Sequence, residues 1–221
     1  MNTELKKRII TSIGLLLLLT TMYFYSYIMI VALLIIAVII WIEFYALISK
    51  IIRGNKFQDI FFRFIFKLTS LLYLSIFVGF IFFIESHYVD LKIYLLYSVL
   101  IAILSDIGGL LFGKTFKGKK LTKISPKKTI SGSIGSFISP LLLIPFFYLE
   151  LIEYSILTLC LITILISLTT QLGDLFISHL KRKAEVKDTS DILPGHGGFL
   201  DRTDGIIFAM PVGLLLFNLF Y

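Results

Sequence analysis

The sequence predicts an all-α, polytopic integral membrane protein with about seven transmembrane helices and a cytoplasmic N-terminus. The chain of 221 residues is 57% hydrophobic and 15% aromatic. Its mean hydropathy of +0.95 does not suit a soluble domain of this size. The apolar residues also form runs of about 20 residues, the length at which a helix crosses a bilayer. A third observation, the placement of basic residues, sets the orientation.

The expected helices cover, in order, about 9–25, 28–48, 66–84, 92–112, 134–149, 154–180 and 204–221. The first two form one almost unbroken apolar run with a turn near Ser26. No small-residue cleavage site follows it, so we interpret it as two spans rather than as a signal peptide. Pro140 and Pro145 are expected to bend the fifth helix, because proline lacks the amide hydrogen that a helix interior uses.

The charge pattern predicts which loops face the cytoplasm. With a cytoplasmic N-terminus, every one of the 21 basic residues except Lys92 falls on that side. An excess of Lys and Arg on the cytoplasmic side is the usual signal of orientation. The net charge of +7 is therefore attributed to topology and anionic lipid. Membrane lipids are expected as partners, and nucleic acid is not. The single cysteine, Cys160, can form no internal disulfide.

Four features outside the main charged cluster receive an interpretation. Glu43 is interpreted as a helix-end carboxylate near the membrane interface. Residues 50–67 are expected to form a basic loop whose phenylalanines rest on anionic lipid. Gly109 and Gly113 have the spacing of a close helix contact. Asp106, in the same helix, is interpreted as functional because a basic loop begins eight residues later.

The densest polar stretch is Gln171–Gly205, with five Asp, five Lys or Arg, two His and five Gly. Charge beside lipid is costly, so such a cluster indicates function. Gln171, Asp174, Ser178 and Lys181 follow one another at spacings of three, four and three, which places them on one face of a helix.

The residue types in this stretch suit a polyphosphate with a metal ion. Carboxylates of Asp174 and of Asp201 or Asp204 can bind a hard cation such as Mg²⁺. Glycines in the turn 195–198 allow backbone amides to approach an anion. The cations that can neutralise phosphates are Lys127, Lys128, Lys181, Arg182, Lys187 and Arg202. Neither HExxH nor a Walker A loop is present, which argues against a zinc protease and a P-loop enzyme.

The preceding basic loop contains a second anion-binding candidate. Its segment Ser125-Pro126-Lys127-Lys128-Thr129 combines a fixed turn with two ammonium groups and two hydroxyls. Such groups suit phosphate oxygens, with lysine acting as a point charge. The lysines from Lys117 to Lys123 are expected to serve topology alone.

The segment from Ser178 to Asp204 resembles the signature of the phosphatidate cytidylyltransferases (CDP-diacylglycerol synthases). The resemblance rests on Lys181-Arg182, on Lys187-Asp188, on Leu193–Phe199 and on Asp201-Arg202-Thr203-Asp204. Gln171-x-Gly173-Asp174-Leu175 and the Ser125–Thr129 segment also fit, so the resemblance extends over about 105–221. Ile130 and Ser131 depart from it, because members usually carry Trp and an acidic or amide residue there.

The resemblance implies transfer of CMP from CTP to phosphatidate, giving CDP-diacylglycerol and pyrophosphate in phospholipid biosynthesis. It implies Mg²⁺ as cofactor, with room for a second cation, and Asp174 and Asp201 as metal ligands. The expected catalytic residues are Asp174, Lys181, Arg182, Lys187, Asp188, Asp201, Arg202 and Asp204. The expected substrate-binding residues are Ser125, Lys127, Lys128, Thr129, Ser178, Gly195, His196, Gly197 and Gly198.

The chain is expected to divide into N-terminal transmembrane helices (1–90) and a C-terminal catalytic transmembrane region (91–221) with cytoplasmic loops 114–133 and 181–203. We expect a multi-pass protein of the cell inner (plasma) membrane, and the charge pattern places its site at the cytoplasmic face; the expected partners are CTP and phosphatidate, with a homodimer as one assembly. Two alternatives stay open. One is a CTP-dependent transferase that acts on another lipid, such as an isoprenoid. The other is a transporter of an anionic metabolite.

Overall fold

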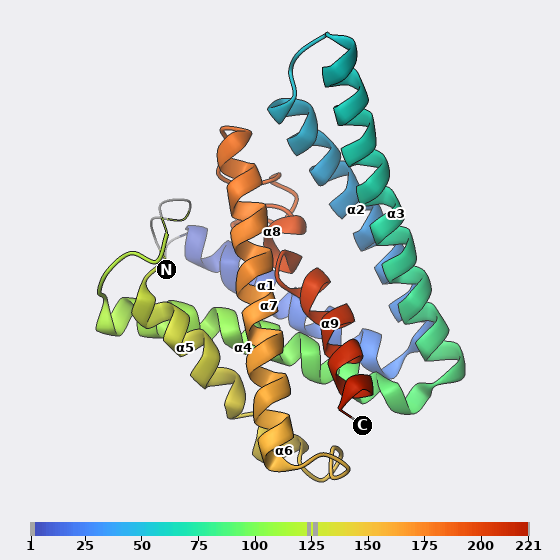
Figure 1. The fold of residues 1–221 in the computed structure, drawn as a ribbon, viewed down its shortest axis with the longest axis vertical. Coiled ribbons are helices and arrows are strands. Elements are labelled where there is room, and N and C mark those ends of the chain that lie inside the picture. The colour runs from blue at the N-terminus through green and yellow to red at the C-terminus, as the bar shows by residue number, and fades with distance from the viewer. Residues whose placement is uncertain (1–2, 123–124, 126–127, 221) are drawn as a thin grey trace. The chain divides into compact units, whose positions relative to one another are not determined.

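The structure is a computed structural model that describes residues 3–122, 125 and 128–220. Helices dominate these residues, and their β-structure is limited to two isolated bridges, Lys120–Thr129 and Leu193–Gly197. The all-α class is therefore confirmed (Figure 1). The elements are α1 (Thr3–Phe24), α2 (Ser26–Ile51), α3 (Phe57–His87), η1 (Val89–Leu91), α4 (Lys92–Phe116), α5 (Ile130–Leu141), α6 (Ile144–Phe147), α7 (Ile156–Lys183), α8 (Leu200–Thr203) and α9 (Ile206–Leu219).

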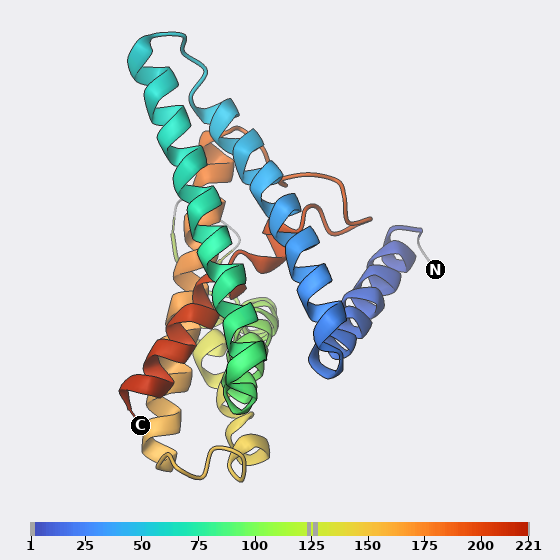
Figure 2. The ribbon, with the colours of Figure 1, turned by 90° about the vertical axis from the view of Figure 1, so that its right-hand side faces the viewer.

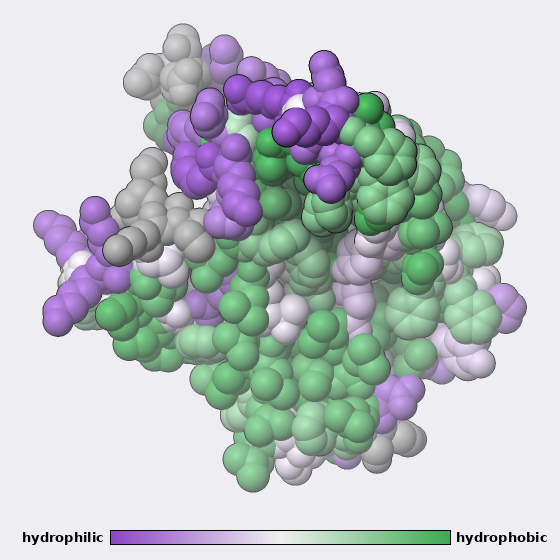
Figure 3. Space-filling model, turned by 45° about the horizontal axis from the view of Figure 1, so that its top comes forward, coloured by the Kyte–Doolittle hydropathy of each residue, from purple (hydrophilic) through white to green (hydrophobic). Residues whose placement is uncertain are grey.

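Within the described residues, six helical segments are long and apolar enough to cross a membrane. The seventh expected helix is shorter than predicted, since α9 has 14 residues. At 1.5 Å per residue it is about 21 Å long, less than a hydrocarbon core of about 30 Å. The fifth span, Ile130–Phe147, is interrupted after Leu141, beside Pro140 as expected. Large apolar side chains such as Ile76 and Leu157 are exposed, and the face in Figure 3 is mostly hydrophobic with hydrophilic residues gathered in patches. The polytopic membrane class is confirmed.

The described chain forms two compact units. The first unit contains Met1–Val89 and Leu180–Thr203, and the second contains Asp90–His179 and Asp204–Tyr221. In the first unit, α2 and α3 run side by side in opposite directions (Figures 1 and 2). The turn between α1 and α2 lies at Tyr25, next to Ser26, where the sequence predicted it.

The predicted basic loop 50–67 is largely helical, which corrects that expectation. Helix α3 begins at Phe57, so the connection is confined to residues 52–56. Phe57 stacks on Phe61 one turn later, with ring centroids 6.3 Å apart. Lys67 places its Nζ 3.3 Å from the ring centroid of Tyr45 on α2. Aromatic residues at helical spacing thus continue α3 through a segment whose charges suggested a loop.

The second unit has an aromatic core and close helix contacts. Phe217 on α9 stacks on Tyr94 of α4 at 4.5 Å, and its carbonyl accepts a hydrogen bond of 2.8 Å from the Tyr154 hydroxyl. A Cβ on Gly109 of α4 would lie 2.5 Å from the Ser136 hydroxyl of α5. A side chain at position 109 would displace the Ser136 hydroxyl, so the predicted packing role of Gly109 is confirmed.

Hydroxyl groups connect three helices of the second unit. The Ser105 hydroxyl of α4 lies 3.0 Å from that of Ser167 on α7. Ser167 donates to the Ser136 carbonyl of α5, and Ser136 donates to the Ser105 carbonyl, each at 2.8 Å. At the end of this series Ser133 donates to Gln171 on α7 at 2.6 Å. These bonds fix the register of α7, which carries Asp174 and Ser178.

Candidate active site

The first unit holds most of the predicted signature in a loop between α7 and α8. The loop folds back on itself through two backbone bonds of 2.8 Å, from Leu193 N to Gly197 O and from His196 N to Leu193 O. Gly195 and Gly197 have φ angles of 76° and 83°. A side chain is strained in that left-handed region, so the turn requires both glycines. The predicted tight turn at 195–198 is present.

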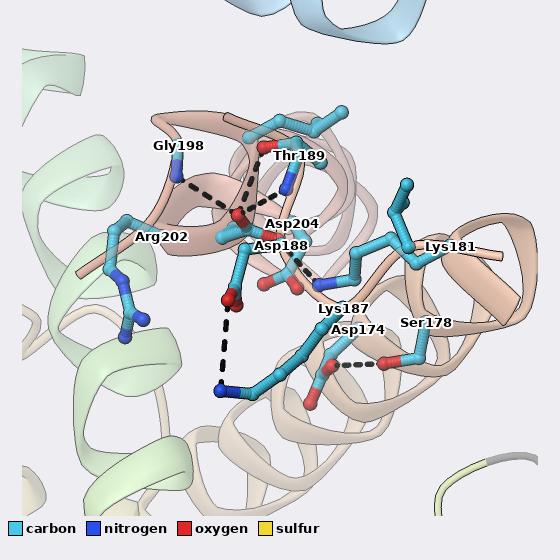
Figure 4. Close-up of polar contacts among 12 residues, drawn as sticks. Asp174, Ser178, Lys181, Lys187, Asp188, Thr189, Gly198, Arg202 and Asp204 are labelled. Atoms are coloured by element: carbon cyan, nitrogen blue, oxygen red, sulfur yellow. Dashed lines mark hydrogen bonds and ion pairs between the residues drawn. The ribbon is translucent and has the colours of Figure 1, made fainter. Parts of the chain in front are cut away.

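Asp201, on α8, is the centre of this loop. Its Oδ2 accepts hydrogen bonds from Thr189 N at 2.8 Å, Gly198 N at 2.9 Å and Thr189 Oγ1 at 2.9 Å. Its Oδ1 pairs with Lys181 Nζ at 2.6 Å, and the Asp201 side chain is 3% exposed. Figure 4 draws these bonds as dashed lines from the labelled Lys181, Thr189 and Gly198.

The contacts of Asp201 decide its charge state. Burial by itself would raise the pKa of this carboxyl, but the bond from Lys181 and the amides of Gly198 and Thr189 outweigh burial. The pKa of Asp201 is held below its usual value, so Asp201 is a carboxylate at neutral pH. Lys181 and Asp201, which the sequence proposed as separate phosphate and metal ligands, form a buried ion pair.

The other predicted cations of the first unit differ in exposure. Arg202 is exposed, and its Nε and Nη2 donate to the His196 carbonyl at 3.0 and 2.7 Å, which closes the turn. Arg182 is exposed on the last turn of α7. The Lys187 side chain is 77% exposed, and its Nζ lies 3.8 Å from Asp188 Oδ2 (Figure 4). Arg182 and Lys187 are thus the cations best placed to meet a soluble anion.

The turn 194–196 is supported by α1, which the sequence did not reveal. The Thr11 hydroxyl donates to the Pro194 carbonyl at 2.9 Å, and the Ser12 hydroxyl lies 3.3 Å from His196 Nε2. Burial first, and then the charge of Arg202, lower the pKa of His196. The imidazole is therefore neutral near pH 7 and serves as a hydrogen-bonding group. Its predicted part in binding phosphate would be that of a neutral donor.

The second unit holds a smaller cluster on α7. Ser178 Oγ donates to Asp174 Oδ1 at 3.2 Å (Figure 4), and Lys128 forms an ion pair with Asp174 Oδ2. The side chains of Lys128 and Asp174 are 27% and 23% exposed. The basic loop that ends at α5 thus contacts the helix of the signature, and the predicted binding of an anion by Lys128 stays a prediction.

The remaining predicted residues of the second unit form hydrogen bonds with backbone amides close to them in the sequence. Thr129 caps α5 by accepting a 3.1 Å hydrogen bond from Gly132 N. Ser125 accepts at its carbonyl from Lys128 N at 3.0 Å. Asp204 is 5% exposed, and its Oδ1 accepts from Gly205 N at 3.0 Å. Lys127, also predicted to bind substrate, lies outside the described residues. Asp106, predicted to be functional, is exposed on α4.

The position of Glu43 in the structure differs most from the one expected from the sequence. It lies inside α2, is 2% exposed, and accepts hydrogen bonds from Thr189, Ser190, Phe199 and Leu200 of the signature loop. It therefore does not lie at the end of the helix, which corrects that part of the interpretation. An acid inside an apolar run was the available signal, but the sequence does not reveal its partners.

The fit of the implied Mg²⁺ can be examined for each carboxylate. Within the described residues no group of three or more His, Cys, Asp or Glu side chains could hold a metal ion. Mg²⁺ is commonly bound by one or two carboxylates together with water and substrate phosphates. Asp174 fits this mode, because it is partly exposed and its Oδ2 pairs with the Lys128 ammonium, which a bound cation could replace. Asp201 fits it less well, because three donors occupy Oδ2 and Lys181 is paired with Oδ1.

The fold and these clusters define a multi-pass helical membrane protein with clustered cationic and carboxylate groups, and comparison with known proteins identifies its family. The model of the cytidylyltransferase family matches residues 1–220, so the chain belongs to this family. It is 40% identical over 177 residues to the phosphatidate cytidylyltransferase of Staphylococcus aureus strain COL, with 79% of this chain and 66% of the relative covered. The corresponding protein of Staphylococcus haemolyticus is 39% identical over the same length. That of Rickettsia bellii is 37% identical over 190 residues, covering 80% of this chain and 82% of the relative.

Proposed function

We propose that this protein is a phosphatidate cytidylyltransferase, which transfers CMP from CTP to phosphatidate. The observation that carries the proposal is the signature loop, in which Asp201 holds Lys181, Thr189 and Gly198 while Arg182 and Lys187 are exposed. The name of the relatives agrees with it. The chain spans just under two thirds of the length of the staphylococcal relatives.

The reaction brings together two anions that repel each other, and the cationic groups reduce this repulsion. A phosphate oxygen of phosphatidate forms a bond to the α-phosphorus of CTP. The bond from that phosphorus to the oxygen bridging to the β-phosphate breaks, and pyrophosphate leaves with its electron pair. Arg182 and Lys187 neutralise the triphosphate and stabilise the charge that grows on the leaving group. A phosphomonoester has a second pKa of about 6, so the nucleophile is largely ionised without a strong general base.

Mg²⁺ is proposed as the cofactor. Asp174 would hold it, whereas Asp201, the other expected ligand, has its Oδ1 paired with Lys181. When bound, the ion would supply positive charge to the triphosphate oxygens. The protein's own groups do the remaining work. Ser178 orients the Asp174 carboxylate, and the Lys128 ammonium counters charge beside it. Neither group is arranged as a nucleophile of a catalytic triad.

The cellular setting is part of the same proposal. Basic residues gathered in the loops around 114–133 and 181–203 support a cytoplasmic site, where CTP is available. A bacterial plasma membrane then supplies phosphatidate from within the bilayer. A homodimer remains a prediction that cross-linking in native membranes can test.

The test is product formation by the purified protein in mixed micelles. It receives Mg²⁺, phosphatidate and CTP, ATP, GTP or UTP in turn, and pyrophosphate and CDP-diacylglycerol are both measured. The proposal expects both products with CTP alone and only when phosphatidate is present. An isoprenoid phosphate or alcohol that replaces phosphatidate productively would change the substrate. Absence of both products with every pairing would refute a transferase and favour the transporter.

Two variants make the test specific to the site. Asp174→Asn alters the carboxylate that best fits the cation, and turnover should fall at least a hundredfold. Asp90→Asn is the matched control, because it makes the same substitution in the exposed turn Val89–Leu91. Equal activity of the two variants would exclude Asp174 from catalysis.

A further inference from the structure

Glu43 is the one buried acid of helix α2, and the proposed reaction does not use it. It lies in the span Ser26–Ile51, whose mean hydropathy is 2.8, and it is 2% exposed. A carboxylate in such a helix is costly unless polar groups satisfy it. The groups that satisfy Glu43 therefore indicate why it is there.

Four donors surround the Glu43 carboxylate, and each oxygen accepts from one hydroxyl and one backbone amide. Oε1 accepts from Ser190 Oγ at 2.5 Å and from Phe199 N at 3.1 Å. Oε2 accepts from Thr189 Oγ1 at 3.0 Å and from Leu200 N at 2.7 Å. Thr189 and Ser190 open the signature loop, whereas Phe199 and Leu200 close it. One side chain thus holds both ends of the loop together.

The loop is shaped around this carboxylate. A Cβ on Gly198 would lie 2.5 and 2.6 Å from the two Glu43 oxygens and 2.1 Å from Thr189 Oγ1. Glycine at 198 therefore leaves room for the acid. Thr189 Oγ1 is also 2.9 Å from Asp201 Oδ2, so its single proton can serve either carboxylate. Glu43 and Asp201 together fix the base of the loop, from the membrane helix and from α8.

We propose that Glu43 is a positioning residue for the cytidylyl-transfer site. Its contacts hold residues 189–200 so that the turn 194–198 and the adjoining Lys187 and Arg202 keep a fixed geometry toward the CTP phosphates. This role rests on the proposed function, but the structural part of it does not. Glutamate is required because it is an acceptor at both oxygens and reaches across one more methylene than aspartate.

Glu43→Gln is the central variant. The glutamine amide can place its oxygen toward one hydroxyl–amide pair only, and its NH₂ then faces the donors of the other pair. We expect kcat to fall at least tenfold and KM for CTP to rise, while KM for phosphatidate changes less than twofold. Glu43→Asp keeps both acceptors and should recover part of kcat. Glu85→Gln in α3 is the matched control, because Glu85 accepts from Ser26 in the same unit, and it should retain wild-type kinetics.

Hydrogen exchange provides the readout that separates positioning from general damage. In Glu43→Gln the amides of Phe199 and Leu200 should exchange at least tenfold faster than in the wild type. The Gly198 amide is bonded to Asp201 and should be affected less. Unchanged exchange at 199 and 200 together with kcat/KM within twofold of wild type would overturn the proposal.

The proposal can still be tested if the Glu43→Gln variant does not fold or if the wild-type protein is inactive. If Glu43→Gln fails to fold, Ser190→Ala removes one donor without altering the acid, and it should speed exchange at Phe199 through the shared Oε1. Protection equal to wild type in that variant would also overturn the proposal. If the wild-type protein makes no CDP-diacylglycerol, the proposed function fails, and the exchange experiment alone decides whether Glu43 holds the loop.

Discussion

Replacement of Asp201 by asparagine should destabilise the first unit more than removal of its partner Lys181. The Lys181 side chain is 11% exposed and that of Asp201 is 3% exposed, with 2.6 Å between Nζ and Oδ1. Asp201→Asn leaves a buried ammonium without its counter-charge, which costs about 3–5 kcal/mol. In a chain of this length 1 kcal/mol moves the unfolding midpoint by about 2–4 °C, so we expect a loss of roughly 10 °C.

Lys181→Met should cost less, because Thr189 and Gly198 still donate three hydrogen bonds to Asp201. The double variant should be more stable than the sum of the single losses predicts, by about 1–3 kcal/mol. The protein has one tryptophan, Trp41, and it lies on α2 of the same unit. Its fluorescence during heating in detergent at a fixed scan rate, without nucleotide or divalent cation, reports the midpoint.

The control for this series is Asp191→Asn, which makes the same change at an exposed position of the same loop. It should move the midpoint by less than 2 °C. A shift that small in Asp201→Asn, or a double variant whose loss equals the sum of the singles, would refute the buried ion pair as a source of stability.

Three further predictions concern pH, the turn and the exposed cation. The pKa of Asp201 in the folded protein is lowered, so the stabilisation from its carboxylate is complete above the unfolded pKa of about 3.9 and is lost as pH falls through the folded pKa. The unfolding midpoint followed by Trp41 fluorescence should therefore decrease below pH 4 in the wild type and change less in Asp201→Asn. Curves of midpoint against pH that run parallel in the two proteins would contradict this. Gly197→Ala should lower the free energy of unfolding by about 1–3 kcal/mol, because φ at this position is 83° and the added Cβ would lie 2.8 Å from Asp201 Oδ2. Gly79→Ala in α3 is the control: nothing lies within 4 Å of its added Cβ, so stability should be unchanged or increased. Lys187→Met should raise KM for CTP about tenfold with an unchanged midpoint, and Lys183→Met, also exposed, is its control; equal KM values in the two variants would remove Lys187 from nucleotide binding.

Much of the fold was predictable because lipid imposes a simple rule on sequence. Apolar runs located the helices, and Ser26 marked a turn between them. Charged and aromatic residues that alternate are ambiguous in sequence, and α3 continues through Arg63 and Lys67, which suggested a loop. It also overestimated α9, because hydropathy does not show that Asp204 and Gly205 precede the helix rather than belong to it.

The candidate site was predictable as a list of residues but not as a set of contacts. Spacing and resemblance identified Asp174, Lys181 and Asp201. They did not show that Lys181 forms an ion pair with Asp201, or that the Thr189 hydroxyl lies within hydrogen-bond distance of both the Glu43 and the Asp201 carboxylates. Glu43 was the largest omission. Its partners lie 146 to 157 residues away, and neither periodicity nor composition links positions at such a distance.

That distance also has a consequence for biosynthesis. A chain made from its N-terminus delivers α2 to the bilayer when none of the donors to Glu43 has yet been translated. Throughout synthesis of about 150 more residues the acid must be met by water, lipid headgroups or the insertion machinery. The signature loop is then the last part that completes α2, so a chain that stops before Thr189 would leave the Glu43 carboxylate without any of these four donors.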